Sequence, residues 1–518
     1  MRKETILLLF ILLLAGFLRF WQLDSIPPGL YPDVAINGND ALSAWEGRDF
    51  KVFYPENNGR EGLFLNLIAL SFAVFGPSAW MIKAVAAVIG LLTVLGTYLL
   101  AKELFPNHKY LSLVSALLLA TSFWHLNFSR LGFRAVMVPF FLVFFSYFLF
   151  RAFRKKEVCS ALLAGAFFGL GFHTYIAFRV APLLLPFILA PFYLVYRRES
   201  QQKKYFSLSI VFFLTTFVVA LPIGLYFLNH PQDFLGRAAG VSVFSSANPI
   251  FGLAQSFFVH LQMFVFVGDS NWRHNLPGFP QLSPGLGILM FLGLFVLARY
   301  LVRECRQREW PKVAVQGFLL SWFFVLLLPG VLTSEGIPHS LRTIGVLPVA
   351  YILTGLGLFW LKERFTKRPL VFVTALALVI SLGVFFDPYR YFFVWARNPN
   401  VEGAFTKNYL AVGNLLNSLP EGTKKYVIVN EPGVPVLGSA GLPMPAQTPI
   451  FIERSVFGRR RATYLLPADL DKIQTDGQET VVVPLKDDPE TFEKLKTIFP
   501  SGQIGEENKL KIYKISRP

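Results

Sequence analysis

The sequence is poor in charge and almost free of cysteine. Charged residues make up 16% of its 518 positions, against about 25% in ordinary globular chains. Because 54% of the residues are apolar, the low charge excludes both a typical soluble enzyme and intrinsic disorder. The two cysteines, Cys159 and Cys305, exclude a disulfide framework. We therefore expect most of the chain to lie in a lipid bilayer.

Several common site motifs are also missing. The chain has no Walker A loop, no dinucleotide fingerprint after a strand, no Cys-x-x-Cys pair and no His-Glu-x-x-His helix. Its apolar runs carry few ionisable residues away from their ends. Transporters and pumps usually need such residues near mid-membrane. The sequence therefore favours chemistry at the membrane surface over transport through the membrane.

Eleven apolar runs have the length expected of membrane spans. With the N-terminus placed inside, the short inner loops hold +14 of the net charge of +17. That asymmetry follows the positive-inside rule, so the basic charge indicates topology and not nucleic-acid binding. We expect a multi-pass protein of the cell membrane with a cytoplasmic N-terminus and with Arg19 extending to the outer interface. The expected spans are residues 5–23, 80–101, 110–126, 136–152, 161–174, 180–196, 206–228, 285–303, 313–331, 343–361 and 369–386.

Outside these spans, three longer segments face the extracytoplasmic side in this topology. The first loop ends in an apolar stretch, 62–75, that is too short to span and is expected to lie at the interface. The second holds a similar stretch at 250–267. Residues 387–518 have an ordinary composition, and their patterns predict a small soluble α/β domain after a transmembrane domain of residues 1–386. Its strands are expected at 425–430, 479–484 and 509–515, and its helices at 402–418 and 489–498.

Carboxylates are concentrated in the first outer loop. Such a loop, held against the bilayer beside the basic Arg60, suits acid–base chemistry on a lipid-attached substrate. The alternative is a hydrated loop whose carboxylates are simply solvated. The acidic residues of the loop are Asp24, Asp33, Asp40, Glu46, Asp49, Glu56 and Glu61.

The other outer turns supply basic and aromatic groups at the depth of lipid headgroups. Arginine there can bind a phosphate through two parallel hydrogen bonds. The alternative is that these residues only anchor the protein, as interfacial arginines and aromatic belts do in any polytopic protein. The candidates are Arg130, Arg134, His173, Tyr175, Arg179, Arg273, His274, His339 and Arg342.

Short motifs in these segments resemble a known group of enzymes. They stand at residues 27–33, 58–64, 124–134, 271–275 and 338–342. Their order is similar to that in the bacterial relatives of protein O-mannosyltransferases and of the lipid A aminoarabinose transferase. These are polyprenyl-phosphate-sugar-dependent glycosyltransferases of the GT-C architecture. The resemblance covers about residues 1–386 and implies a GT-C-like membrane domain.

The resemblance also implies roles for individual residues. Asp33 takes the position of the general base, although Val34 stands where many members have a glutamate. Glu61 matches an acidic residue that helps to bind acceptor or metal, and it is followed by Gly62 where many relatives have proline. Neither the residues nor the resemblance assigns a definite cofactor, and a divalent metal is left open. The positions expected to hold the lipid phosphate are Arg60, Arg273 and Arg342, with His274 and His339 as weaker candidates.

Together these observations predict an inverting glycosyltransferase. It would move a sugar from a polyprenyl-phosphate donor, a membrane lipid, to an extracytoplasmic protein, lipid or glycan. The rival hypotheses are a transporter or flippase of lipid-linked saccharides, which should show polar residues along a mid-membrane path, and a non-catalytic scaffold, which should tolerate loss of Asp33. Asp40 is the local competitor for the role of base.

Overall fold

The structure is a computed structural model, and it describes residues 2–108, 110–240, 242–245, 248–364 and 369–515. Its contacts divide the chain into two compact units that do not follow chain order. Unit 1 comprises Met1–Trp21 and Ala86–Trp395, and unit 2 comprises Gln22–Val85 and Ala396–Pro518. The sequence suggested a boundary after residue 386. That boundary stays a prediction; by contacts, unit 1 ends at Trp395, and the first loop groups with the tail in unit 2.

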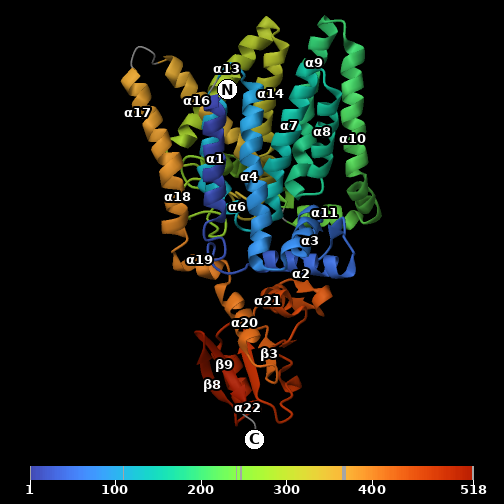
Figure 1. The fold of residues 1–518 in the computed structure, drawn as a ribbon, viewed down its shortest axis with the longest axis vertical. Helices are drawn as coiled ribbons and strands as arrows, with labels where there is room; N and C mark the ends of the chain where they lie inside the picture. Colours follow the sequence, from blue (N-terminus) through green and yellow to red (C-terminus); the bar gives the residue numbers. More distant parts are fainter. Residues whose placement is uncertain (1, 109, 241, 246–247, 365–368, 516–518) are drawn as a thin grey trace. The chain divides into compact units, whose positions relative to one another are not determined.

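Unit 1 is built of helices, most of them long and apolar (Figure 1). A helix satisfies its backbone polar groups internally, which a segment in hydrocarbon must do. The π-helical turns Ser381–Phe386 and Arg390–Trp395 flank α18. The helices are α1 (Arg2–Phe20), α4 (Ala79–Leu104, which begins in unit 2), α5 (Leu111–Thr121), α6 (Phe123–Phe128), α7 (Met137–Lys155), α8 (Val158–Gly171), α9 (Leu185–Arg198), α10 (Gln202–Asn229), α11 (Pro231–Gly240), α12 (Pro249–Gln262), α13 (Leu286–Gln307), α14 (Trp310–Val325), α15 (Leu328–Val331), α16 (Leu347–Arg364), α17 (Pro369–Ile380) and α18 (Asp387–Tyr389).

Eight helical segments within the described residues are long and apolar enough to cross a membrane. They overlap eight of the eleven expected spans, although the last, Leu376–Trp395, ends nine residues beyond the expected 369–386. The other three expected spans correspond to α1 and to the shorter α5 and α8. The chain is therefore a polytopic α-helical membrane protein, as its composition predicted.

Close helix packing in unit 1 depends on small residues. A Cβ atom added to Gly293 of α13 would lie 2.0 Å from the carbonyl oxygen of Leu353, and one added to Gly357 of α16 would lie 2.1 Å from that of Leu289. Only glycine allows the two backbones to approach this closely. Small residues fulfil this function at helix contacts in lipid, where no hydrophobic effect drives the helices together.

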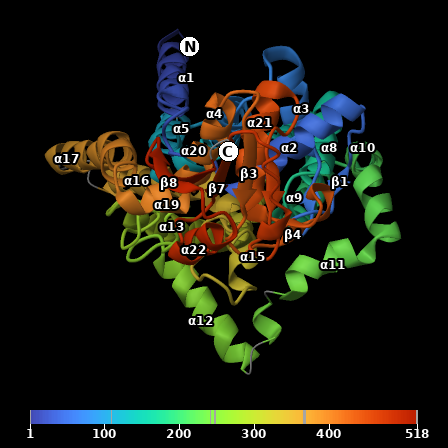
Figure 2. The ribbon, with the colours of Figure 1, turned by 90° about the horizontal axis from the view of Figure 1, so that it is seen from below.

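The second long loop forms α11 and α12, which lie at the edge of unit 1 in Figure 2. On α12, Ile250, Phe251 and Phe258 are exposed, whereas Ser256 and His260 are buried. Exposed aromatic and aliphatic side chains opposite a buried polar face agree with the expected interfacial helix at 250–267.

In unit 2, the first loop folds into α2 (Pro32–Gly47), the two-stranded pair β1 (Phe53–Tyr54) and β2 (Arg60–Glu61), and α3 (Leu63–Phe75). The last of these is the apolar stretch that the sequence placed at the interface. It buries Phe64, Ile68 and Phe72, while Val74 and Phe75 at its end are each 73% exposed.

The tail forms a five-stranded sheet of order β6-β3-β7-β9-β8, with β3 parallel to β6 and β7 and the other pairs antiparallel. The three expected strands are present as β3 (Lys424–Ile428), β7 (Thr480–Pro484) and β9 (Leu510–Ile515). The expected helices are also present, with α19 (Pro399–Ala404) and α20 (Lys407–Ser418) in place of one continuous helix, and α22 (Pro489–Ile498). The sequence did not predict β4 (Pro435–Val436), β5 (Leu442–Pro443), α21 (Gln447–Phe457), β6 (Thr463–Leu465) or β8 (Gln503–Glu507).

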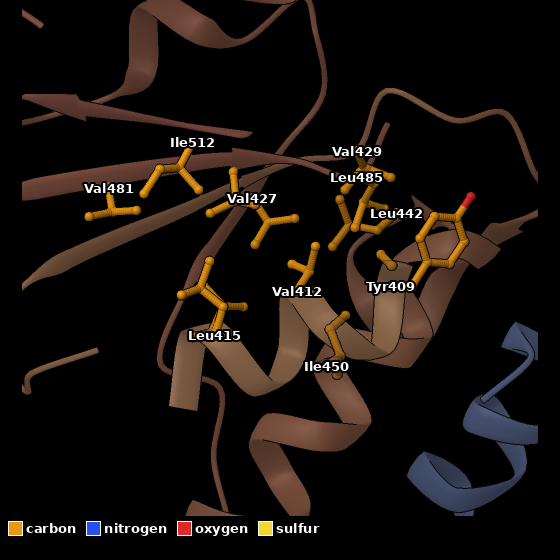
Figure 3. Close-up of a cluster of buried hydrophobic side chains, with 14 residues drawn as sticks. Tyr409, Val412, Leu415, Val427, Val429, Leu442, Ile450, Val481, Leu485 and Ile512 are labelled. Carbon is orange, nitrogen blue, oxygen red and sulfur yellow. The ribbon is translucent and has the colours of Figure 1, made fainter. Parts of the chain in front are cut away.

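Unit 2 has an apolar core between its sheet and two helices. Val412 and Leu415 of α20 and Ile450 of α21 face Val427 of β3 and Ile512 of β9 (Figure 3). The other side of α21 packs on α2. There Asn39 donates hydrogen bonds to the backbone and side-chain oxygens of Gln447, and Glu46 forms an ion pair with Arg454. The first loop is thereby fixed to the tail.

Candidate functional site

Asp33 occupies the first turn of α2, directly after Pro32. Proline suits this turn because its missing N–H has no helical partner there. The positive end of the helix dipole also stabilises a carboxylate at this place. Asn57 donates a hydrogen bond of 2.9 Å to Oδ1 of Asp33, whose side chain is half-buried. Asn57 thereby holds one carboxylate oxygen of Asp33, and the other oxygen, Oδ2, can accept a proton.

Asn37 and Asp40 lie four and seven residues after Asp33 and therefore share its face of α2. Arg60, from β2, reaches this face and is only 1% exposed. Its guanidinium forms an ion pair of 2.5 Å with Asp40 and donates to Oδ1 of Asn37 at 2.9 Å and to the carbonyl oxygen of Glu56 at 3.2 Å. Burial raises the pKa of Asp40, and the charge of Arg60 opposes that shift.

These contacts change the interpretation of Arg60. The sequence grouped it with the phosphate ligands, but its guanidinium is buried and directed at groups within unit 2. Glu61, its neighbour, is 2% exposed and pairs with Phe53 of β1. Glu56 accepts hydrogen bonds from the backbone N–H groups of Leu437 and Gly438. Two of the first-loop acids, Glu46 and Glu56, thus bind the tail of unit 2, which the sequence could not indicate.

In unit 1, two loops meet at Asp269. Oδ2 of this carboxylate accepts hydrogen bonds of 2.9 Å from Nδ1 of His274 and from both the backbone N–H and the hydroxyl of Ser340. Oδ1 accepts from the backbone N–H of Asn271 at 2.8 Å. His339, next to Ser340, has its ring centroid 5.0 Å from that of His274. The structure therefore brings the 271–275 and 338–342 motifs together at this carboxylate.

The charges of the side chains in this cluster affect one another. Burial opposes ionisation of Asp269, but the hydrogen bond from His274 and the nearby His274 and His339 outweigh it and lower the pKa of the carboxyl. Burial, then the proximity of His274 and Arg342, lowers the pKa of His339, which favours a neutral ring. Asp269 and Ser340 were not singled out from the sequence. The only signal was an aspartate five residues before His274.

Arg273 and Arg342 flank this cluster. Asn127, from the 124–134 motif, donates to the backbone carbonyl of Arg273 at 2.8 Å, so a third motif joins the other two. The side chain of Arg342 is 13% exposed and pairs at 3.5 Å with Glu335, which is 71% exposed. Its guanidinium also donates to the backbone carbonyl oxygen of Glu335 at 3.3 Å, and an ion pair with so exposed a partner is weak.

The weaker candidates have other surroundings. Arg130 is fully buried and donates to the carbonyl oxygens of Leu18, Arg19 and Trp21, at 2.8 Å each, so it caps the last turn of α1. Arg19, expected at the outer interface, is also fully buried, and its guanidinium contacts Nδ1 of His125 at 2.8 Å. The carbonyl oxygens at the ends of α1 and α5 lie in apolar surroundings, and the two buried guanidinium groups donate the hydrogen bonds that these oxygens would otherwise lack.

Four more candidates lie on other parts of unit 1. Arg134 stacks over the ring of Tyr175 at 5.2 Å, and Nε2 of His173 contacts the carbonyl oxygen of Val219 at 2.9 Å. Arg179 lies over Phe227 and Phe234 and donates to the carbonyl oxygen of Phe234. Among the described residues, it is the one ionisable side chain that lines a largely apolar cavity of about 630 Å³. The lining is Phe172, Arg179, Ala220, Ile223, Gly224, Phe227, Leu228, Pro231 and Phe234.

Comparisons with known proteins fit this architecture. The family described as dolichyl-phosphate-mannose-protein mannosyltransferase matches residues 63–223. The structure of ArnT from Cupriavidus metallidurans in the apo state is similar over 99% of this chain and 98% of that chain, at 13% identity and a TM-score of 0.59. The structure of the same protein bound to undecaprenyl phosphate is similar over 99% of this chain and 99% of that chain, at 13% identity and a TM-score of 0.56.

The oligosaccharyltransferase of Archaeoglobus fulgidus, tethered to an acceptor peptide, is similar over 83% of this chain at 16% identity and a TM-score of 0.51. The chain spans 62% of the length of that protein. No curated protein sequence matches the chain. The chain therefore shares the fold of these proteins, which is the GT-C architecture of a polytopic membrane protein, and it matches the mannosyltransferase family over residues 63–223.

Proposed function

We propose that this protein transfers a sugar from a polyprenyl-phosphate donor to an acceptor hydroxyl or amine outside the cytoplasm, with inversion at the sugar carbon. The observation that carries the proposal is the environment of Asp33. Of the two acidic side chains on its face of α2, Asp40 is bound by Arg60, whereas within the described part of the chain Asp33 has one amide partner, Asn57. Asp33 is therefore the carboxylate better prepared to accept a proton.

The reaction needs no nucleotide, because the donor arrives activated. The acceptor oxygen or nitrogen gives its proton to Asp33 and forms a bond to the anomeric carbon. The bond from that carbon to the phosphate oxygen breaks, and the polyprenyl phosphate leaves with the electron pair. This single displacement inverts the configuration of the sugar.

The leaving group gains negative charge, and in unit 1 Arg273 and Arg342 are the residues that we assign to neutralise it. The loose pairing of Arg342 with exposed Glu335 supports this role. The apolar cavity that contains Arg179 supports a donor with a long hydrocarbon chain and an anionic head. The matched family, named for its dolichyl-phosphate-mannose donor, and the ArnT structure bound to undecaprenyl phosphate also support a donor of this class.

Glu61 keeps its proposed place on the acceptor side of the reaction, whereas Arg60 is removed from the phosphate ligands because its contacts are internal to unit 2. We further propose that the N-terminus is cytoplasmic and that the tail lies outside. The +14 charge of the inner loops supports this orientation.

The test is transfer from a panel of radiolabelled polyprenyl-phosphate sugars by the purified protein in detergent. Asp33→Asn should still bind donor and should lose transfer by at least about a hundredfold, the lower range for removing a general base. Glu46→Gln is the matched control, because Glu46 lies on the opposite face of α2 and contacts Arg454. Near-normal transfer by Asp33→Asn, together with none by Asp40→Asn, would refute the assignment of the base.

A further inference from the structure

A cavity of about 310 Å³ lies at one end of unit 1, where α4, α7, α13, α14 and α16 meet. Its volume falls within the range of small-ligand sites, about 300–1,000 Å³. A site that joins apolar walls to charged groups suits an amphiphilic ligand. The lining combines apolar and aromatic side chains with charged and amide groups, among them Leu104, Arg154, Leu297, Glu304, Gln316 and Phe359.

The cavity lies at the end of unit 1 that holds the start of α1 (Figure 1). There Glu4 of α1 forms an ion pair of 2.8 Å with Lys102 of α4, two residues before Leu104 of the lining. In the proposed orientation this is the cytoplasmic side. Arg273, which we assign to the donor phosphate, lies instead in the loop before α13, a helix whose 22 residues rise about 33 Å. The cavity is therefore separate from the proposed site of transfer.

Two buried oxygen atoms in the lining lack hydrogen-bond donors. Glu304 is 2% exposed, and its Oε1 accepts from Arg303 at 2.6 Å, whereas no group among the described residues donates to Oε2. Nζ of Lys312 stays 3.7 Å from Oε2. Oε1 of Gln316, which is 7% exposed, also has no donor within the described chain. Because buried polar atoms in folded proteins are nearly always paired, these two oxygens indicate a ligand that donates hydrogen bonds.

Cations of the lining lie closer to solvent than these two oxygens. The side chains of Arg303 and Lys312 are 57% and 60% exposed, and that of Arg154 is 24% exposed. The exposed cations mark the mouth of the cavity, because Glu304 and Gln316 are shielded from solvent. An ammonium group therefore fits the inner oxygens, and a phosphate fits the cations at the mouth.

A second, more open hollow of about 640 Å³ follows α13 and shares Tyr300 and Arg303 with the cavity. The guanidinium of Arg303 lies over the ring of Tyr300 at 4.7 Å, at the border of the two spaces. The hollow is lined in part by Phe295 and Val302, which are 56% and 54% exposed. Lipid tails are as apolar as such side chains. A ligand whose head occupies the cavity can therefore lay hydrocarbon chains along α13.

We propose that the cavity binds the headgroup of a phospholipid that carries both a phosphate and a primary ammonium, as phosphatidylethanolamine does. The ammonium has three N–H donors, which Oε2 of Glu304 and Oε1 of Gln316 accept. Lys312 and Arg303 bind the phosphate, and the acyl chains lie against Phe295. A choline headgroup has the same charges but no N–H donor, and a glycerol headgroup lacks the positive charge.

This proposal goes beyond the proposed function, and only the choice of leaflet depends on the proposed orientation. Lipid binding is measured without sugar transfer, so the two proposals can fail separately. Asp33→Asn should lose transfer and keep the lipid.

The experiment measures lipid binding to the delipidated full-length protein in detergent by native mass spectrometry. The probes are phosphatidylethanolamine, phosphatidylcholine and phosphatidylglycerol with identical acyl chains, and glycerophosphoethanolamine, which has the head without the chains. The wild type should bind one phosphatidylethanolamine at least about tenfold more tightly than phosphatidylcholine, because the charge-assisted hydrogen bonds are lost with choline. Glycerophosphoethanolamine should compete only weakly.

Two variants test the inner oxygens. Glu304→Gln keeps the size of the side chain without its charge, and Gln316→Leu removes the amide. Each should reduce the preference for phosphatidylethanolamine over phosphatidylcholine by about threefold to tenfold. Gln316→Leu should not lower the thermal midpoint, because it removes an unpaired polar atom from a buried place. Lys312→Gln should weaken both lipids by a similar factor, since both carry the phosphate.

Glu157→Gln is the matched control, because Glu157 lies just after α7 at the same end of unit 1, pairs with Arg151 and does not line the cavity. It should leave lipid binding unchanged, and thermal midpoints show that each variant is folded. Equal affinity of the wild type for phosphatidylethanolamine and phosphatidylcholine, or a preference that persists in both the Glu304 and Gln316 variants, would overturn the proposal. Tighter binding of phosphatidylglycerol would overturn the ammonium assignment. Competition by glycerophosphoethanolamine as strong as that by the lipid would overturn the assignment to a lipid.

Discussion

Replacing Arg60 by methionine tests whether this residue supports the fold of unit 2 or binds the donor. The change removes the ion pair to Asp40 and the hydrogen bonds to Asn37 and to the carbonyl oxygen of Glu56, while keeping an apolar stem of similar length. Breaking a buried pair from one side costs about 3–5 kcal/mol, because it leaves a charge uncompensated. The Asp40 side chain is 24% exposed, so water relieves part of this cost, and we expect about 2–3 kcal/mol.

The assay is thermal unfolding of the purified protein in detergent. At about 2–4 °C per kcal/mol for a unit of this size, the midpoint should fall by roughly 4 to 12 °C. Adding Asp40→Asn to the same chain removes the unpaired charge, so the double variant should recover much of the loss. Equal losses in the single and double variants would show that no such pair stabilises the protein.

The loss should also depend on pH. Burial raises the pKa of Asp40, with Arg60 opposing, so ionisation of this carboxyl costs stability as pH rises from the ordinary aspartate value of about 3.9 through the raised pKa. Without Arg60 that pKa rises further, and the penalty extends to higher pH. The destabilisation by Arg60→Met should therefore be largest at neutral pH and should shrink on acidification. If the Arg60→Met variant unfolds at the wild-type midpoint at neutral pH but no longer binds donor, this reasoning is refuted. Arg60 would then again be assigned to the phosphate ligands.

Two further predictions concern the donor and the topology. Arg273→Lys and Arg342→Lys should each weaken donor use about tenfold to a hundredfold, with thermal stability unchanged. Lysine lacks the planar guanidinium that binds a phosphate through two hydrogen bonds, and a lost charge-assisted contact costs about 1.5–3 kcal/mol. Arg130→Lys, the control, should lower thermal stability instead, because it loses part of the cap on α1. Wild-type donor kinetics in the Arg273 and Arg342 variants would show that they only anchor the protein. A reporter enzyme that works only outside the cytoplasm should be active when it is fused after Pro518. Activity of a reporter that works only in the cytoplasm would overturn this orientation.

The sequence was informative where a pattern is local. Long apolar runs specify helices because a segment in hydrocarbon must satisfy its own backbone, and eight of the expected spans recur as long apolar helices. The strands at β3, β7 and β9 were predictable because β-branched residues are concentrated in them. The short strands β6 and β8 were not, since three to five mixed residues carry too little periodicity to be recognised.

The surroundings of each candidate residue depended on contacts between distant segments. The sequence gives Arg60, Arg130 and Arg342 the same chemistry, and only their partners separate a buried ion pair, a helix cap and a loosely paired cation. The composition determined a membrane protein, because the hydrophobic effect acts on every apolar run wherever it lies. The tertiary structure alone decided that Asp269, His274 and His339 meet, because hydrogen bonds and ion pairs act only at short range and join residues that the chain holds far apart.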